Sequence, residues 1–216
     1  EDVIYYLTVY NEPMPQPAEP ENVNAAGIVQ GMYLLKEGSF EGVNPDARRV
    51  QLLASGVGVP WALEAQELLK RDYGVVADVW SVTSWTELRR EAMACDEHNF
   101  LHPEAERALP FVTRRLSGRP GPVVATSDYM RQVPDQIAQW VPARFVSLGA
   151  DGFGFSDTRA AARRFFHIDG PSMAVRALQA LAEEGQLDWS IPREAAERYR
   201  LLDVTAGASG SAGGES

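Results

Sequence analysis

Residues 49–82 decide the fold, because they contain two strand-like apolar runs with a helical pattern between them. The first run is RVQLLA (49–54) and the second is VVADVWSV (75–82). Between 61 and 70, apolar residues recur at helical spacing. Two strands joined by a helix are typical of a parallel β-α-β unit, so an α/β fold is expected.

The same alternation continues toward the carboxyl end. Further strands are expected at 122–125 and 145–148, and further helices at 86–96, 128–140, 157–166, 172–184 and 192–199. Ser84 lies three residues before Glu87, the spacing of a capping box. Ser127 or Asp128 is placed to cap one later helix and Asp157 another. Residues 49–203 are therefore predicted to form a three-layer α/β domain with a mostly parallel sheet.

The segments outside this domain have different compositions. A strand-like run at 3–10 follows only two polar residues, as if the chain were the carboxy-terminal piece of a larger protein. Residues 11–48 are expected to form a proline-rich linker, a short helix over 25–36 and a polar loop. Residues 204–216 are rich in Gly, Ala and Ser, which predicts a disordered tail.

Composition excludes several classes of protein. The 216 residues carry 20 basic and 30 acidic side chains, a formal net charge of −10, which disfavours a nucleic-acid surface. No apolar run approaches the ~20 residues that span a bilayer, so no membrane partner is expected. A lone cysteine, Cys95, excludes an internal disulfide and favours a reducing, cytoplasmic setting.

One turn resembles half of a dinucleotide-binding fingerprint. The run SGVGVP (55–60) joins a strand to a helix, and Asp78 follows Gly58 by 20 residues, near the position of a ribose-binding acid. Against this, the third glycine position holds Trp61, and Asp78 lies inside a strand rather than at its end. A tight strand-to-helix turn is the preferred interpretation, with nucleotide binding as the alternative.

Other catalytic patterns are weak. His98 and His102 are four residues apart but near an expected helix end, and His167 is distant in sequence, so no zinc site is predicted. Cys95 has no partner histidine in a motif, and no Gly-x-Ser-x-Gly elbow occurs. The sequence therefore predicts no catalytic, cofactor-binding or metal-binding residue in this chain.

A glycine- and aromatic-rich loop follows the strand at 145–148. It suits either a structured loop or an interface, and its acids do not alternate as in a calcium loop. Its residues are Asp151, Gly152, Phe153, Gly154, Phe155, Ser156 and Asp157. Five tryptophans favour docking to a partner, with core packing as the alternative for three of them; they are Trp61, Trp80, Trp85, Trp140 and Trp189.

Four strings occur in an order that resembles one family. They are VWSVTSWTEL (79–88), NFLHP (99–103), TSDYM (126–130) and LGADGFG (148–154). Over residues 1–203 the chain resembles the carboxy-terminal domain of the bacterial homodimeric pyruvate dehydrogenases, which are transketolase-like thiamine-diphosphate enzymes. Phe155 stands where relatives often carry arginine, and His98 stands near a position that is often tryptophan; these are departures at expected subunit or domain contacts.

The resemblance implies a five-stranded sheet and makes residues 1–10 the end of a middle, pyrimidine-binding domain. It also implies thiamine diphosphate and Mg²⁺ in the parent enzyme, bound outside this chain. The implied partners are a second copy of the parent chain, its own amino-terminal and middle domains, and the lipoyl acyltransferase component. The leading hypothesis is a structural and dimerisation domain; the alternatives are a free-standing nucleotide-binding domain and a module that contacts the lipoyl partner.

Overall fold

The computed structural model describes residues 2, 4, 9, 10, 13, 14, 16–21, 23 and 25–210. Within these residues, five strands form one sheet in the order β1-β3-β2-β4-β5. Its strands β2 to β5 are parallel, and β1 pairs antiparallel with β3. The strands are β1 (Met32–Lys36), β2 (Arg49–Ala54), β3 (Val76–Val82), β4 (Val123–Thr126) and β5 (Phe145–Leu148). The predicted five-stranded, mostly parallel sheet is therefore confirmed.

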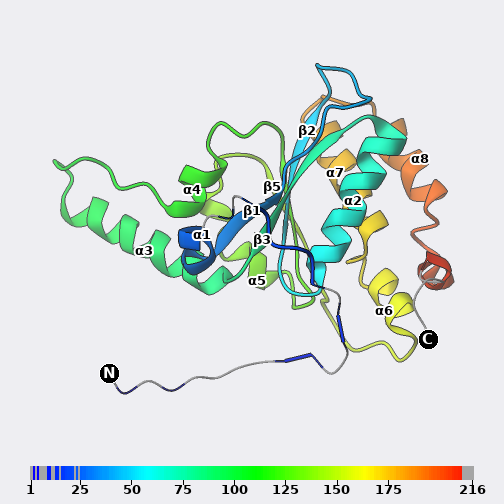
Figure 1. Cartoon of the computed structure of the whole chain (residues 1–216), viewed down its shortest axis with the longest axis horizontal. Coiled ribbons are helices and arrows are strands. Elements are labelled where there is room, and N and C mark those ends of the chain that lie inside the picture. The colour runs from blue at the N-terminus through cyan, green and yellow to red at the C-terminus, as the bar shows by residue number, and fades with distance from the viewer. Residues whose placement is uncertain are drawn as a thin grey trace.

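Helices cover both faces of this sheet and complete the three layers (Figure 1). One face carries α2 (Gly58–Tyr73), α7 (Gly170–Glu183) and α8 (Ser190–Arg198). The other carries α3 (Trp85–Leu101) and α4 (Phe111–Leu116). The remaining helices are α1 (Ala25–Gln30), α5 (Gln132–Asp135), α6 (Arg159–Phe165), and the 3-10 helices η1 (Ala138–Trp140) and η2 (Val204–Gly210).

The strands are apolar on both sides because both faces of the sheet are buried. In β2, Val50 and Leu52 pack into the core beneath α2 and α7, whereas Leu53 packs into the core beneath α3 and α4. Its parallel neighbour Trp80 joins Leu53 in the second core and is fully buried. This alternation fixes the register of the sheet, since a slip by one residue would exchange the two faces.

The prediction of one helix over 25–36 is wrong. This segment divides at Gly31 into α1 and the edge strand β1, which lies in the sheet although it falls before the predicted domain start at 49. Gly31 has a φ of +108°, a left-handed conformation that favours glycine. A Cβ on Gly31 would also lie 2.7 Å from the carbonyl oxygen of Ser84. Short apolar runs such as MYLLK fit either a helix or a strand, and pairing with β3 decides this one.

Several element boundaries also differ from expectation. Ser84 caps α3 as predicted, by accepting a hydrogen bond from Glu87 N at 3.1 Å, but α3 continues to Leu101. The cap of α6 is Thr158, not Asp157, whose carboxylate accepts from the Thr158 N–H instead. The single helix expected over 128–140 is replaced by α5 and η1, and α4 was not anticipated.

The two chain ends complete the comparison with the sequence. The strand expected at 3–10 falls mostly outside the described residues. The tail predicted from residue 204 begins instead with η2, which packs against α6, while residues 211–216 also lie outside the described set. None of the helices formed by the described residues has the length and apolar character needed to cross a bilayer.

Candidate functional site at the carboxyl edge of the sheet

The carboxyl ends of β2 and β4 lie at the topological switch point of the sheet. From β2 the chain crosses to β3 on one side, while β4 lies on the other side. Open α/β sheets bind ligands in the crevice at such a point. Here Ser55 follows β2, and Ser127 and Asp128 follow β4, with the two serine hydroxyls 3.4 Å apart.

A segment from the start of the chain crosses this crevice. We call its described residues (Val9, Tyr10, Pro13, Met14, Gln16 and Pro17) the N-terminal strap. The Tyr10 hydroxyl donates to an Asp128 carboxylate oxygen at 3.1 Å and accepts a hydrogen bond from the Val57 backbone. Met14 packs against the small apolar cluster that contains Val57 and Trp61. The strap is thus held at the crevice by polar and apolar contacts.

Tyr10 occupies the place that a phosphate would take in a dinucleotide-binding turn. Gly56 has a φ of +50°, and a Cβ on it would lie 2.4 Å from the Tyr10 hydroxyl oxygen. The N–H of Gly58 donates to Ser55 O, the N–H of Val59 donates to Gly56 O, and proline at position 60 has no N–H. The backbone N–H groups at the start of α2 therefore already donate to carbonyl oxygens of the chain. For this reason the turn does not fit a diphosphate.

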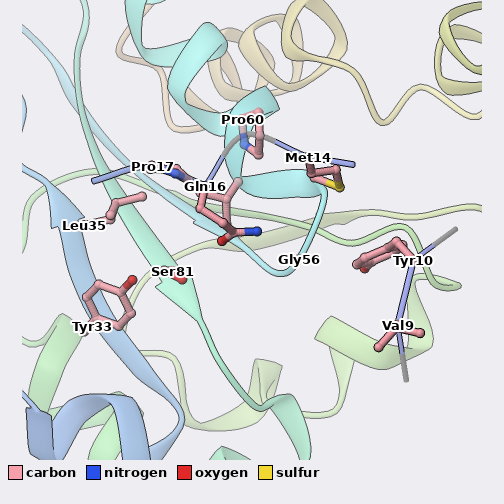
Figure 2. Close-up of a pocket in the computed structure, with 11 residues that line it drawn as sticks. Val9, Tyr10, Met14, Gln16, Pro17, Tyr33, Leu35, Gly56, Pro60 and Ser81 are labelled. Atoms are coloured by element: carbon pink, nitrogen blue, oxygen red, sulfur yellow. The ribbon is translucent and has the colours of Figure 1, made fainter. Parts of the chain in front are cut away.

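A cavity of about 410 Å³ lies beside this turn, between the strap and the strands β1 and β3. Figure 2 shows Tyr33, Leu35 and Ser81 on one side of the cavity and Tyr10 on the other, with Met14 near Pro60. The described residues that line it include tyrosine and serine hydroxyls but no charged side chain. Burial and the nearby Asp128 raise the pKa of Tyr10, which removes it further from neutral-pH acid–base chemistry.

Asp78, the candidate ribose-binding acid, lies near the opposite edge of the sheet. Its side chain is fully buried and accepts two hydrogen bonds from Arg49, at 2.8 and 3.0 Å, and one from Gly38 N at 2.9 Å. Arg119 also lies within 3.4 Å. A carboxylate surrounded in this way holds the fold together and has no free face for a ribose, so its 20-residue spacing from Gly58 is a coincidence.

The histidines and the cysteine form no reactive centre in the described residues. The rings of His98 and His102 lie side by side at the end of α3, with centroids 5.0 Å apart and planes tilted by 46°. Among the residues that the structure describes, no group of three or more His, Cys, Asp or Glu side chains could hold a metal ion. Burial and the neighbouring Glu91 raise the pKa of Cys95, which disfavours the nucleophilic thiolate.

The loop of residues 151–157 is anchored at both ends and exposed in the middle. Arg131 donates to both Asp151 carboxylate oxygens, and this contact lowers the pKa of Asp151. Phe155 stacks on Phe165 of α6, with centroids 4.4 Å apart and planes 9° from parallel. Between these anchors, the Phe153 side chain is 95% exposed. The arrangement presents one aromatic ring to solvent from a fixed base.

The tryptophans divide between core and surface. Trp61, Trp80 and Trp85 are buried, as in the core-packing alternative for three of them. Trp140 is partly buried and donates to Asp96 at 2.8 Å. Trp189 is 55% exposed. A surface rich in tryptophan is therefore not present in the described residues.

A buried ion pair that the sequence analysis did not predict joins α6 to α7. Arg164 of α6 donates to Asp169 at 2.6 Å and to the carbonyl oxygens of Tyr199 and Arg200 at the end of α8. Asp169 in turn caps α7. Burial and the charge of Asp169 raise the pKa of nearby Glu64 on α2. These contacts join four helices around one guanidinium, which the sequence spacing does not reveal.

Residues 31–169 match the family model described as "Transketolase-like TK C-terminal domain". The chain therefore belongs to the transketolase-like C-terminal domain family. A solved transketolase from Campylobacter jejuni superposes on 77% of this chain and 20% of its own, with a TM-score of 0.46 and 19% identity.

Curated relatives narrow the similarity. Over 95% of its length the chain is 51% identical to the "Pyruvate dehydrogenase E1 component" of Mycolicibacterium smegmatis. It is 48% identical, over the same share, to the protein of that name from Mycobacterium tuberculosis. In both comparisons the chain spans 22% of the relative.

Proposed function

We propose that this chain is the carboxy-terminal domain of a thiamine-diphosphate-dependent pyruvate dehydrogenase and that its role there is structural. The observation that carries the proposal is the 51% identity to a pyruvate dehydrogenase E1 component across 95% of the chain. The parent enzyme oxidatively decarboxylates pyruvate and passes the acetyl group to the lipoyl group of the acyltransferase component. This domain supplies no group to that reaction.

Thiamine diphosphate, bound with Mg²⁺ elsewhere in the parent enzyme, supplies the chemistry of decarboxylation. The described residues here do not fit it, because the N–H groups of Gly58 and Val59 are already bonded within the chain. The carboxylate of Asp128 beside them would also repel a diphosphate. We therefore assign no cofactor-binding residue to this chain.

The domain organisation follows from the same proposal. Residues 1–10 end the preceding pyrimidine-binding domain, and the segment from 11 leads into the sheet. Because β1 belongs to the sheet, the sheet begins at Met32. The body of the domain then runs to residue 203, with 204–216 as an appendage. The lone Cys95 favours a cytoplasmic enzyme.

The proposed partners are a second copy of the parent chain, its own amino-terminal and middle domains, and the lipoyl acyltransferase. The loop of residues 151–157 is a candidate contact for one of them, because Phe153 is 95% exposed on an anchored base. Large aromatic side chains are enriched at such contacts. Crosslinking to a lipoyl domain, with and without Phe153→Ser, tests the lipoyl partner; equal crosslinking would remove this loop from that role.

Calorimetry with thiamine diphosphate and Mg²⁺ tests the main proposal. We expect no binding heat from the chain alone. We expect binding and pyruvate decarboxylation when the chain is mixed with the amino-terminal and middle portions of the M. smegmatis relative. Asp78→Ala is the control for folding, because a destabilised domain should restore less activity. Specific binding by the chain alone would overturn the proposal, and a Gly58→Trp variant would then test the turn.

A further inference from the structure

The second half of helix α3 buries no side chain in the described structure, although Asp96 and Asn99 are hydrogen-bonded to Trp140 and to the backbone of Ala108. The buried residues of α3 are Trp85, Leu88 and Ala92, all in its first half. Beyond them, Met93 is 45% exposed, Phe100 82% and Leu101 59%. Figure 1 shows α3 extending away from the sheet. The exposed apolar side chains on this half of α3 are therefore available to a partner surface.

Along α3 runs an open groove of about 840 Å³. The groove residues Thr86, Arg89, Met93, Glu97 and Phe100 recur every three or four positions and so share one face of the helix. The centre of this face is the apolar Met93. Its two halves carry opposite charge, which is the pattern expected of a surface that pairs with another helix rather than with lipid or nucleic acid.

The charges are arranged symmetrically about Met93. Arg89 lies four residues before Met93, and Glu97 lies four residues after it. If two copies of α3 pack antiparallel across a two-fold axis through Met93, Arg89 of each copy lies opposite Glu97 of the other. Thr86 then lies opposite Phe100 by the same arithmetic. The face is complementary to itself in one antiparallel register.

These two charges are available for such a contact. Arg90 is bonded to Glu87 within the same helix, and Asp96 accepts a hydrogen bond from Trp140. By contrast, within residues 25–210, neither Arg89 nor Glu97 takes part in an ion pair. The pair with free charge is therefore the pair that the two-fold arrangement brings together.

We infer that the face of α3 centred on Met93 is a contact between two copies of this chain, antiparallel about a two-fold axis. The inference rests on the proposed function in that it takes a second copy as the partner. A single pair of helix faces is small beside the ~1,200–2,000 Å² of a stable interface, so it forms one part of a larger contact. The charges set the register of the pair more than its strength.

Disulfide trapping tests the axis. A residue on a two-fold axis meets its own copy, so Met93→Cys in a Cys95→Ser background should form a disulfide-linked dimer under mild oxidation. Met130→Cys in the same background is the matched control, because Met130 is 51% exposed and lies outside α3. Thr86→Cys should crosslink to Phe100→Cys in a mixture and less readily to itself. Equal rates for the Met93 and Met130 variants would overturn the inference.

Charge exchange tests the register. Arg89→Glu or Glu97→Arg, added to Met93→Cys, places like charges opposite each other twice and should slow crosslinking by about tenfold. The double exchange should restore the rate, because it reverses both partners. All these positions lie outside the core, so thermal unfolding should stay unchanged and confirm that the variants fold. Slowing that the double exchange does not reverse would argue against this register.

The outcomes separate the contact from the proposed function. If crosslinking fails but mixing restores thiamine-diphosphate binding, the function stands and the α3 contact is wrong. If crosslinking follows the predicted pattern but mixing restores no binding, the contact stands and the function is wrong.

Discussion

The amino ends of the parallel strands form one edge of the sheet (the amino edge), and their carboxyl ends form the other (the carboxyl edge). The two edges use their polar residues in different ways. At the amino edge, Asp78 is enclosed by Arg49, Gly38 and Arg119, and Gln51 accepts a hydrogen bond from Trp80. At the carboxyl edge, Asp128 receives one hydrogen bond from Tyr10, and its other oxygen is buried without a partner among the described residues. The first edge is held by buried ionic contacts, whereas the second is closed by a segment from far away in the sequence.

This difference shows why a candidate site must be judged by its place in the sheet. The acid that spacing suggested, Asp78, is at the edge where parallel sheets do not place ligands. The edge where they do is occupied by Tyr10. The following changes test this contrast between a rigid amino edge and a removable cover at the carboxyl edge.

The largest effect is expected at the amino edge. Asp78→Ala leaves Arg49 without its buried partner and should lower the free energy of unfolding by about 3–5 kcal/mol. Urea denaturation measures this free energy of unfolding. Asp46→Asn, at an exposed carboxylate, is the control and should change the free energy of unfolding by less than about 0.5 kcal/mol. A small loss in Asp78→Ala would mean that the amino edge is not the rigid one.

A smaller effect is expected at the switch-point turn. Gly56→Ala forces a side chain into a left-handed conformation and against the Tyr10 hydroxyl, so unfolding should become easier by about 1–2 kcal/mol. In a Tyr10→Ala background the steric part of this penalty should disappear, leaving the backbone part. A penalty that is the same in both backgrounds would show that Tyr10 does not occupy the turn in solution.

Acid should weaken the amino edge. Asp72, near the end of α2, contacts Arg71, Arg198 and Tyr199, and the Arg71 hydrogen bond is the largest cause that lowers its pKa to about 2. Because the pKa is lowered, the ionised form stabilises the fold above its unfolded value of about 4, and this stability is lost as the pH falls through about 2. The stability difference between wild type and Asp72→Asn should follow that window in urea titrations. A difference independent of pH would contradict it.

Alkali should release the carboxyl edge, with the smallest effect on global stability. Burial raises the pKa of Tyr10, so its contribution is present below the ordinary value of 10 and is lost as the pH rises through the raised value. Tyr10→Phe should expose residues 9–20 to protease already at neutral pH, while unfolding of the domain changes by less than about 1 kcal/mol. Tyr129→Phe, at a 54% exposed tyrosine, is the control. Equal cleavage of both variants would place the strap elsewhere.

The sequence predicted the strands that follow from clear apolar runs. The strands at 49–54 and 145–148 were predicted with the observed bounds, because continuous apolar runs leave few alternatives. Strand β1 was missed because the short apolar run MYLLK fits either a helix or a strand, and Gly31 separates it from α1 without a clear signal. Cap assignment succeeded at Ser84 and failed by one residue at Thr158, since neighbouring Asp and Thr are both good caps.

The crevice could not be predicted from local pattern. Tyr10 and Asp128 are 118 residues apart, and no spacing rule joins a residue near the start of the chain to the end of a late strand. The string TSDYM (126–130) contains one of the two partners, Asp128, but the sequence pattern there predicted a helix cap. The ion pair of Arg164 and Asp169 was hidden for another reason, because surface and buried arginines look alike in sequence.

The strap has a consequence for the order in which the domain matures. Tyr10 is synthesised before any strand of the sheet, yet its acceptor Asp128 follows β4, which must first pair with β2. On the ribosome, more than half of the domain must therefore be synthesised before the strap can bind. The strap contact forms late, since distant contacts form only after the chain between them is made. While the sheet is incomplete, the crevice at the switch point is open. The strap covers it only after β4 has joined the sheet.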